Sequence, residues 1–349
     1  MSALQWENES STYYKLDDFE KVIKIDAHLH INTEGKQLLS QAEKDNFKLI
    51  TINVDYSDFP KIEIQNEIAK KLSKEYPQRL AFAATFHMDG WDEPEWRHKT
   101  IEAIDERIKE GASAIKVWKN IGMDFRDKSG KLVMIDDPGL DPIFNHIKKR
   151  EIPVIGHLGE PRNCWLPLEE MTVDYDREYF KHHPQYHMYL HPELPSYEDQ
   201  INARDNMLMK HKDLTFVGAH LASLEWSVRK ISEFLTRFPN AVVDTAARIG
   251  PLQYQSIIDR ELVRNFFIKF QDRILYATDI MQMSDEGAEA FVVDSHNLWL
   301  NDWKYFCTDL EFNVPDLKET VKGLKLPKDV IDKIYRFNAE KIFPNIKNN

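Results

Sequence analysis

The sequence predicts an α/β chain that folds as a single (β/α)8 TIM barrel with a long insertion after the fifth strand. Three observations favour this fold. Eight short runs rich in β-branched residues follow one another, each succeeded by a longer segment with helical spacing of apolar residues. The runs are almost continuously apolar, as in parallel strands covered on both faces. Together the eight units span about 260 residues, the usual size of this barrel.

Amphipathic helices are expected between the strands. Two of the clearest cover residues 63–76 and 95–111, and their charged faces suit the outer ring of a barrel. A doubly wound open sheet is the alternative, but no Gly-x-Gly-x-x-Gly turn follows the first strand. The expected strands cover residues 22–30, 49–55, 80–88, 114–120, 152–160, 215–223, 241–249 and 274–281.

We divide the chain into an N-terminal arm, residues 1–21, and a barrel domain, residues 22–349. The arm lacks the cationic and apolar pattern of a secretory signal. Within the barrel, residues 161–200 form an irregular insertion that the fold does not require, and its six Tyr and Trp rings argue against disorder. We expect this insertion to act as a lid over the site or to pack against a neighbouring subunit.

Composition narrows the class of function. The 349 residues carry a net charge of -12, which argues against a nucleic-acid or anionic-membrane partner because no cationic excess exists to neutralise phosphates. No apolar run approaches the length of a membrane span. Two isolated cysteines, Cys164 and Cys307, cannot form a disulfide framework. We therefore expect a cytoplasmic protein that acts on a small-molecule substrate and forms a homo-oligomer, a dimer in the simplest case.

The first expected strand ends in a His-x-His pair, His28 and His30, whose side chains share one face because strand side chains alternate. The carboxyl ends of barrel strands meet at one rim, where function resides. Imidazole and carboxylate groups converging there would suit zinc or manganese. The polar residues at the other strand ends are His87, Lys116, His157, His220, Asp244, Arg248 and Asp279.

With His-x-His on strand one and His157, His220 and Asp279 on strands five, six and eight, the chain resembles the metal-dependent amidohydrolase superfamily, specifically the amidohydrolase-related (amidohydrolase 2) family. Supporting motifs are "GASAIKVWKN", "DDPGLDPIFNHIKKREIPVIGHLGEP" and the closing "IYRFNAEKIFPN". The resemblance covers residues 22–345. It implies a metal-bound TIM barrel, and the family includes hydrolases and non-oxidative decarboxylases. Glu160 in "HLGEP" and the size of the insertion depart from the family pattern.

The resemblance also implies roles for these residues. His28, His30, His157 and Asp279 are expected to hold one divalent transition-metal ion, zinc in the first place with manganese as the alternative. Asp279 would also carry a proton from the attacking water to the leaving group. His220 would polarise the substrate or serve in acid–base catalysis.

Five further residues are expected to bind the substrate. Lys116 is open to a second interpretation, because binuclear members of the superfamily bridge two metal ions with a carboxylated lysine on strand four. One metal ion is the prediction here, with Lys116 as a cation for a substrate carboxylate. The expected substrate-binding residues are Lys116, Glu160, Arg248, Trp165 and His87.

These residues predict a metal-dependent hydrolase that activates water on the bound ion and cleaves a small lactone, amide or ester. The alternative is a metal-dependent non-oxidative decarboxylase, a lyase, of a small carboxylic acid. A barrel that only binds a ligand is disfavoured by the full set of metal ligands. Arg248 and Lys116 suit a substrate carboxylate in either reaction, so they do not discriminate.

Overall fold

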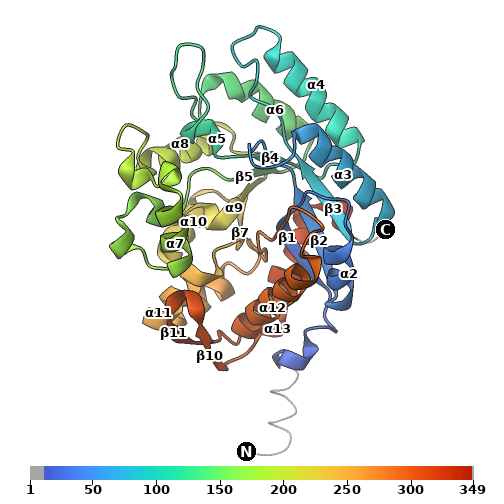
Figure 1. Cartoon of the computed structure of the whole chain (residues 1–349), viewed down its shortest axis with the longest axis vertical. Helices are drawn as coiled ribbons and strands as arrows, with labels where there is room; N and C mark the ends of the chain where they lie inside the picture. The colour runs from blue at the N-terminus through green and yellow to red at the C-terminus, as the bar shows by residue number, and fades with distance from the viewer. Residues whose placement is uncertain (1–11, 348–349) are drawn as a thin grey trace, which may run out of the picture.

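The computed structural model describes residues 12–347 and has the expected α/β architecture. Within these residues, one sheet runs in the order β8-β7-β6-β5-β4-β3-β2-β1-β9, and all its neighbouring strands are parallel. Figure 1 shows the strands in the middle of the molecule with helices around them. The strands are β1 (Lys24–Ile31), β2 (Phe47–Ile52), β3 (Leu80–Ala84), β4 (Ala114–Val117), β5 (Val154–Gly156), β6 (Phe216–Gly218), β7 (Ala241–Asp244), β8 (Ile274–Leu275) and β9 (Met281–Gln282).

The sheet closes on itself through the last expected strand. The predicted strand 274–281 is divided into β8, which pairs with β7, and β9, which pairs with β1. Between them, the backbone N–H of Ala27 on β1 donates to Tyr276 O at 3.0 Å, and the N–H of Asp279 donates to His28 O at 2.8 Å. The nine labelled strands are therefore the eight strands of a closed barrel.

The helices form a layer outside the barrel. The expected helices at 63–76 and 95–111 are α3 and α4, which confirms both within one or two residues. A two-stranded antiparallel hairpin, β10 (Glu311–Val314) and β11 (Glu319–Lys322), follows α12. The helices between and after the strands are α2 (Gln37–Lys44), α3 (Ile62–Glu75), α4 (Trp96–Lys109), α5 (Asn120–Met123), α6 (Asp141–Lys149), α8 (Tyr197–Lys210), α9 (Ala219–Ala222), α10 (Val228–Arg237), α11 (Ile249–Lys269), α12 (Ala288–Cys307), α13 (Lys328–Asp332) and α14 (Asn338–Ile342).

A bulge in β1 turns the His-x-His pair towards the barrel interior. Ile25 and Ala27 belong to the cluster of buried apolar residues inside the barrel, the interior cluster. Leu29 belongs to a second cluster, the strand–helix cluster, which lies between the strands and the surrounding helices. The register with β2 shifts between Asp26 and Leu29, and such a shift changes which alternate residues face inward. His28 can therefore point to the same interior as Ala27, its neighbour in sequence.

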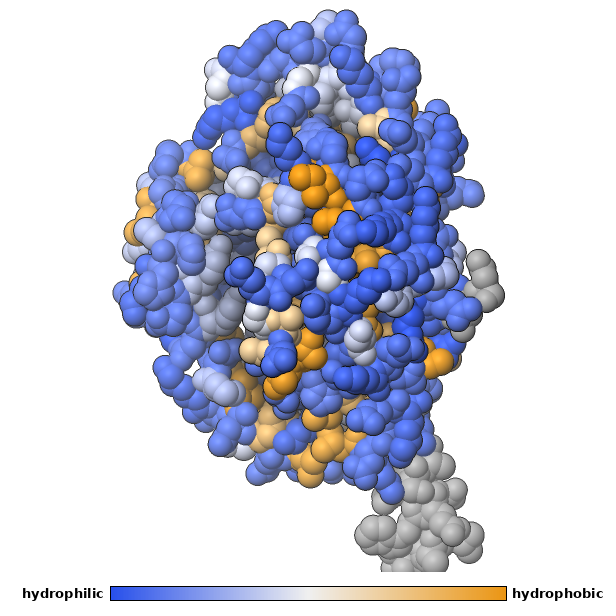
Figure 2. All heavy atoms as spheres, turned by 45° about the vertical axis from the view of Figure 1, so that its right-hand side comes forward, coloured by the Kyte–Doolittle hydropathy of each residue, from blue (hydrophilic) through white to orange (hydrophobic). Residues whose placement is uncertain are grey.

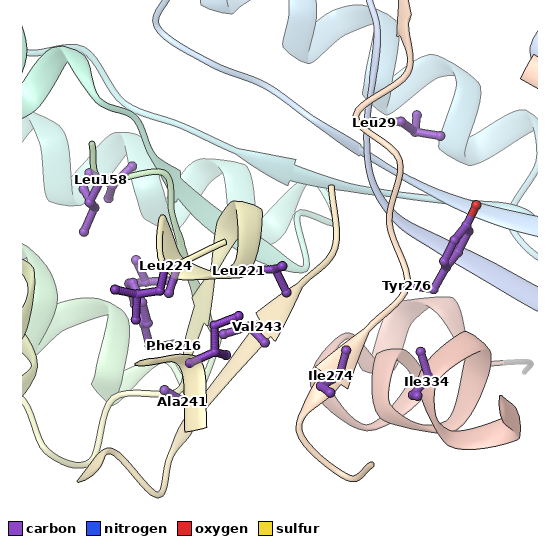
Figure 3. Packing of buried hydrophobic residues seen from close by; sticks show 14 of the residues in the cluster. Leu29, Leu158, Phe216, Leu221, Leu224, Ala241, Val243, Ile274, Tyr276 and Ile334 are labelled. Carbon is purple, nitrogen blue, oxygen red and sulfur yellow. The ribbon is translucent and has the colours of Figure 1, made fainter. Parts of the chain in front are cut away.

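The closing motif seals the opposite end of the barrel. Phe343 and Ile346 pack in the interior cluster. The side-chain amide of Asn338 donates to Gln271 O at 2.7 Å and to Ile274 O at 2.8 Å, which satisfies carbonyls at the start of β8. Figure 3 shows buried residues of the strand–helix cluster, among them Ile274 and Ile334.

The segment between β5 and α8, residues 157–196, has short helices and a small apolar cluster of its own. Cys164, Met171, Phe180 and Met188 are the buried residues of that cluster. Since α8 begins at Tyr197, the last residues of the predicted 161–200 insertion belong to a barrel helix. The helical turns of the segment are η3 (Arg162–Trp165), η4 (Leu168–Glu170), α7 (Asp174–His182), η5 (Pro184–Tyr186) and η6 (Met188–Leu190).

Several strands are shorter than expected. The predicted strands 152–160, 215–223 and 241–249 end at Gly156, Gly218 and Asp244. The chain leaves the extended conformation at these points. After β6 and β7, His220 and Ala247 have positive φ angles of 57° and 53°, which do not belong to an extended strand. The apolar pattern continues past the end of each strand, so it did not reveal the boundary.

Two further features concern the surface and the N-terminal arm. The face in Figure 2 is mostly hydrophilic, with apolar residues in small groups. In the part of the chain that the structure describes, none of the helices combines the length and apolarity needed to cross a bilayer. Residues 1–11 of the predicted arm lie outside the described residues, and the remainder contains the short turn η1 (Leu16–Asp18).

Candidate metal centre

His28 lies at the centre of the polar side chains that meet at the carboxyl ends of the strands. Its Nδ1 is 2.9 Å from Asp244 Oδ2, and because an ionised carboxylate only accepts, Nδ1 carries the proton. Its Nε2 lies 3.6 Å from Asp279 Oδ1. Burial lowers the pKa of His28, and the charge of Lys116 acts in the same direction. His28 is thus a neutral imidazole with an Nε2 lone pair at the site.

Backbone carbonyls hold two more rings in the same way. Nδ1 of His30 is 2.6 Å from Ile52 O, and Nδ1 of His220 is 2.9 Å from Ala246 O. A carbonyl can only accept, so each ring donates through Nδ1 and leaves Nε2 for another partner. Burial lowers the pKa of His220 to about 3. Histidines that bind metals are usually held by such a hydrogen bond from the second nitrogen.

The fourth imidazole, His157, has a buried Nε2 with no hydrogen-bond partner within the described residues. Its ring centroid lies 4.1 Å from that of His220. Burial lowers the pKa of His157 well below its usual value, so the ring is neutral and one of its two nitrogens carries a lone pair. A buried polar atom without a partner is costly, and a metal ion at the site would satisfy it.

Asp279 brings a carboxylate to these nitrogens. Its Oδ1 lies 3.2 Å from His30 Nε2, and its backbone has a left-handed φ of 70°. Burial alone would raise the pKa of Asp279, but the close contact with His30 and the neighbouring His220 and His28 lower it overall. The carboxylate is therefore ionised at neutral pH.

The structure brings together a metal-ligand group that overlaps the predicted set without matching it. His28, His220 and Asp279 each place one ligand atom within 4.8 Å of the others. His220 was expected in acid–base catalysis, whereas His30 and His157 were expected as ligands and lie at the edge of this group. All five side chains nevertheless form one cluster, because His30 contacts Asp279 and His157 packs on His220.

Two buried cations, Lys116 and Arg248, flank the cluster. Lys116 Nζ is 3.3 Å from His28 Nε2, and burial lowers the pKa of Lys116 to about 8. Arg248 donates to Ala247 O at 2.9 Å, while its Nε has no partner. Neither side chain forms an ion pair within residues 12–347. Burial acts to lower the pKa of Arg248, but the surrounding carboxylates raise it overall, so the guanidinium is charged.

The cluster opens into a cavity of about 280 Å³, the inner cavity. Glu160, expected to bind substrate, lies on its wall and is ion-paired with Lys119. Tyr175 and Tyr179 come from α7, so the 157–196 segment forms part of the wall. The aromatic residues of the inner cavity are Tyr56, Phe59, Trp118, Tyr175, Tyr179 and Phe180.

A larger outer cavity of about 880 Å³ adjoins the inner one, and both are lined by Tyr56, Trp118 and Lys119. His87, expected among the substrate-binding residues, lines the outer cavity and not the inner one. Its Nε2 is 2.9 Å from Glu63 Oε1, and its Nδ1 is 3.6 Å from Asp55 Oδ1. The nearby carboxylates, Asp55 first and then Glu63, raise the pKa of His87 to about 9 against the opposing effect of burial.

Trp165, expected among the substrate-binding residues, is not one of the described residues that line the inner or the outer cavity. Its indole N–H points to Pro195 O at 3.4 Å, and its ring packs on Tyr197 with centroids 5.5 Å apart. Trp165 instead belongs to the apolar cluster of the 157–196 segment. An aromatic ring next to a strand end fills a core as readily as a pocket, and the sequence pattern does not distinguish the two.

Asp244 is a site residue to which sequence reasoning gave no role. It accepts the ring N–H of His28 and, through Oδ1, the backbone N–H of His220 at 2.7 Å. Its position at a strand end, after the apolar run 241–243, was the available signal. Burial acts to raise the pKa of Asp244, but the neighbouring His28, whose ring donates a hydrogen bond to it, and the charge of Lys116 lower it overall.

Eight parallel strands closed into a barrel, with imidazole and carboxylate groups at the carboxyl rim, define a TIM-barrel protein of the amidohydrolase type. The sequence profile of the Amidohydrolase family matches residues 25–344. The chain belongs to this family, which confirms the resemblance drawn from its motifs.

Solved structures show the same fold at low sequence identity. The 2,6-dihydroxybenzoate decarboxylase from Rhizobium is 16% identical with a TM-score of 0.53, over 92% of this chain and 98% of that one. A 5-carboxyvanillate decarboxylase from Novosphingobium aromaticivorans, solved with bound manganese, is 12% identical with a TM-score of 0.50, over 94% and 98%. Comparison with curated protein sequences gave no match.

Proposed function

We propose that this chain binds one divalent transition-metal ion at the inner cavity and hydrolyses a small lactone, amide or ester. One observation carries the proposal. Asp279 Oδ1 faces the Nε2 atoms of His28 and His30 at 3.6 and 3.2 Å, while the Nδ1 of each ring already donates to another acceptor. These three atoms converge on the inner cavity, and a divalent cation between them would be coordinated by the carboxylate and by both Nε2 atoms.

We assign His28, His30, His157 and Asp279 as the ligands, with zinc as the first choice and manganese as the alternative. Their nitrogen and oxygen donors suit either ion. The unpartnered Nε2 of His157 supports its inclusion. When bound, zinc lowers the pKa of a coordinated water to about 7 and so supplies hydroxide at neutral pH.

The protein's own groups would handle the protons. Asp279 is ionised, because its pKa lies below the usual range, and it can accept a proton from the attacking water and pass it to the leaving group. His220 is neutral with its proton on Nδ1. Its Nε2 can therefore accept a proton or a hydrogen bond from the substrate, but it can donate only after it has been protonated.

Arg248 and Lys116, which form no ion pair within the described residues, indicate that the substrate also carries an anionic group. Arg248 is only 7% exposed and lines the inner cavity without an ion pair within the described residues. A charged guanidinium in such a place favours a carboxylate or a similar anion, which it can bind through two parallel hydrogen bonds. Lys116 and Glu160 would complete the polar contacts, and Tyr175 and Tyr179 would cover them as a lid.

This observation keeps decarboxylation as the second candidate. A carboxylate held by Arg248 or Lys116 next to the metal would be the reacting group of a lyase, and His220 or Asp279 would control the proton that replaces carbon dioxide. The Rhizobium and Novosphingobium decarboxylases share the fold, and at this identity the likeness concerns the fold alone.

The deciding experiment measures acid release and carbon dioxide release in parallel. Purified protein with measured metal content would be assayed on cyclic lactones, amides and aromatic carboxylic acids. Acid release from a lactone or ester without carbon dioxide supports the hydrolase. Carbon dioxide release from an acid supports the lyase, and turnover that is unaffected by a chelator contradicts both.

A further inference from the structure

Four consecutive residues after β6, none of them glycine, have a left-handed backbone. The φ angles of His220, Leu221, Ala222 and Ser223 are 57°, 58°, 57° and 54°. L-residues visit this region as single residues and not in runs. Such strain persists only where the surrounding structure holds it, and it is concentrated at functional sites. The contacts that hold this turn therefore also determine where the His220 side chain points.

The barrel holds the first half of the turn. Asp244 Oδ1 accepts the N–H of His220 at 2.7 Å. Leu221 is buried in the same apolar cluster as Phe216 and Val243, as Figure 3 shows. The turn lies directly on the end of β6, since a Cβ on Gly218 would come 2.6 Å from the Ala222 Cβ.

Helix α8 holds the second half. Arg204 donates through Nη1 to Ala222 O. The hydroxyl of Tyr197 donates to Ser223 O at 2.5 Å, and Ser223 Oγ donates to Gly159 O at 2.9 Å. The carbonyls at the end of the turn are thus held by side chains from outside the β6–β7 region.

Tyr197 is itself held from two sides. It is 6% exposed, and its hydroxyl accepts a hydrogen bond from Trp226 Nε1 at 2.9 Å. Its ring packs against Trp165 of the 157–196 segment. Continuous contacts therefore run from that segment through Tyr197 to the turn that carries His220.

We propose that Tyr197 is a positioning residue for His220. Its hydroxyl fixes the last carbonyl of the left-handed turn and thereby the direction of the imidazole, and Trp165 supports the Tyr197 ring. The inference deepens the proposed function, since it concerns how one residue of the proposed metal centre is held. Trp165, expected to touch the substrate, acts at the site through Tyr197.

The test uses Tyr197→Phe, which removes only the hydroxyl. The matched control is Tyr305→Phe, which removes another buried hydroxyl, one that lies 2.5 Å from Ser256 Oγ in the α11–α12 contact. Protein with ¹⁵N-labelled histidine is examined by NMR, and His220→Asn identifies the His220 ring signals. We expect these signals to shift or broaden in Tyr197→Phe and to stay in place in Tyr305→Phe.

Unchanged His220 signals in folded Tyr197→Phe would overturn the proposal, as would an equal change in the control. The readout needs neither substrate nor bound metal. A failure to bind metal would therefore contradict the proposed function and leave this inference intact, whereas unmoved His220 signals in a metal-binding protein would contradict only this inference.

A second pair of variants tests the turn itself. Ala219, directly before the turn, and Ala222, within it, are both buried, but only Ala222 has a positive φ. Glycine adopts positive φ without strain, so Ala222→Gly should lower the thermal midpoint less than Ala219→Gly. An equal or larger loss for Ala222→Gly would show that the turn is not left-handed, and the proposal would fall.

Discussion

The carboxylate of Asp244 accepts the Nδ1–H of His28 at 2.9 Å, and both side chains are completely enclosed. The same carboxylate accepts the backbone N–H groups of His220 and Ala246. One buried group therefore fixes the tautomer of a proposed metal ligand and the backbone of a second site histidine.

Asp244→Asn should weaken metal binding about 10- to 100-fold, the usual effect of removing such an outer partner. The side-chain amide of asparagine would direct its own N–H group at one of the N–H groups that now donate to Asp244, and that hydrogen bond would be lost. Metal affinity is measured by competition with a chelating dye. The control is Asp302→Asn, because burial raises the pKa of Asp302 to about 8 and that side chain is already largely neutral at pH 7. Equal affinities in both variants would contradict the role of Asp244.

The purified protein should contain about one transition-metal ion per chain, and His28→Ala or Asp279→Ala should lose it. A site deprived of one of four ligands holds zinc poorly against water. Elemental analysis checks the ratio. Full metal content in both variants would refute the site. Two ions per chain, with an added carboxyl group on Lys116 by mass spectrometry, would replace the single-ion assignment with a binuclear one.

His220 and His157 should behave differently on replacement. We expect His220→Asn to keep the metal and to lose activity by about 10²- to 10⁴-fold, the usual contribution of a proton-transfer group. His157→Asn should lose the metal. The opposite pattern of metal content would make His220 the ligand, in line with its place 4.8 Å or less from His28 and Asp279.

Replacing residues 163–190 with a short Gly/Ser loop should leave the barrel folded and metal-loaded but abolish turnover. The segment packs around its own cluster, while Tyr175 and Tyr179 line the inner cavity. Circular dichroism, metal analysis and activity are measured together. Full activity of the shortened protein would contradict the lid, and a change from oligomer to monomer would assign the segment to assembly.

The ion pairs of His87 predict a pH dependence of stability. The pKa of His87 is raised to about 9, above the value of about 6.5 in an unfolded chain. Its contribution is therefore complete below about pH 6.5 and is lost as the pH rises through 9. The ring is 39% exposed, so solvent screening limits the effect to about 1 kcal/mol or less. Urea unfolding of wild type and His87→Gln should differ at pH 6 and converge above pH 9.

The sequence pattern was sufficient for the barrel and for the composition of its rim. Apolar runs with β-branched residues mark buried parallel strands wherever they fall, and α3 and α4 follow from their amphipathic spacing. Polar residues near the ends of these runs, among them Lys116, His157 and Asp279, were the candidates for the carboxyl rim of the barrel.

Only the tertiary structure decided how these residues meet. The bulge in β1, the left-handed turn at His220 and the positive φ of Asp279 are held by hydrogen bonds between residues far apart in sequence, such as the one from His220 to Asp244. Trp165 packs against Tyr197 and not over the cavity, because contacts with residues distant in the sequence also determine its position. The local sequence pattern determines which face of a strand a side chain occupies. Non-local contacts determine the strained backbone conformation and, through it, the direction in which the side chain points.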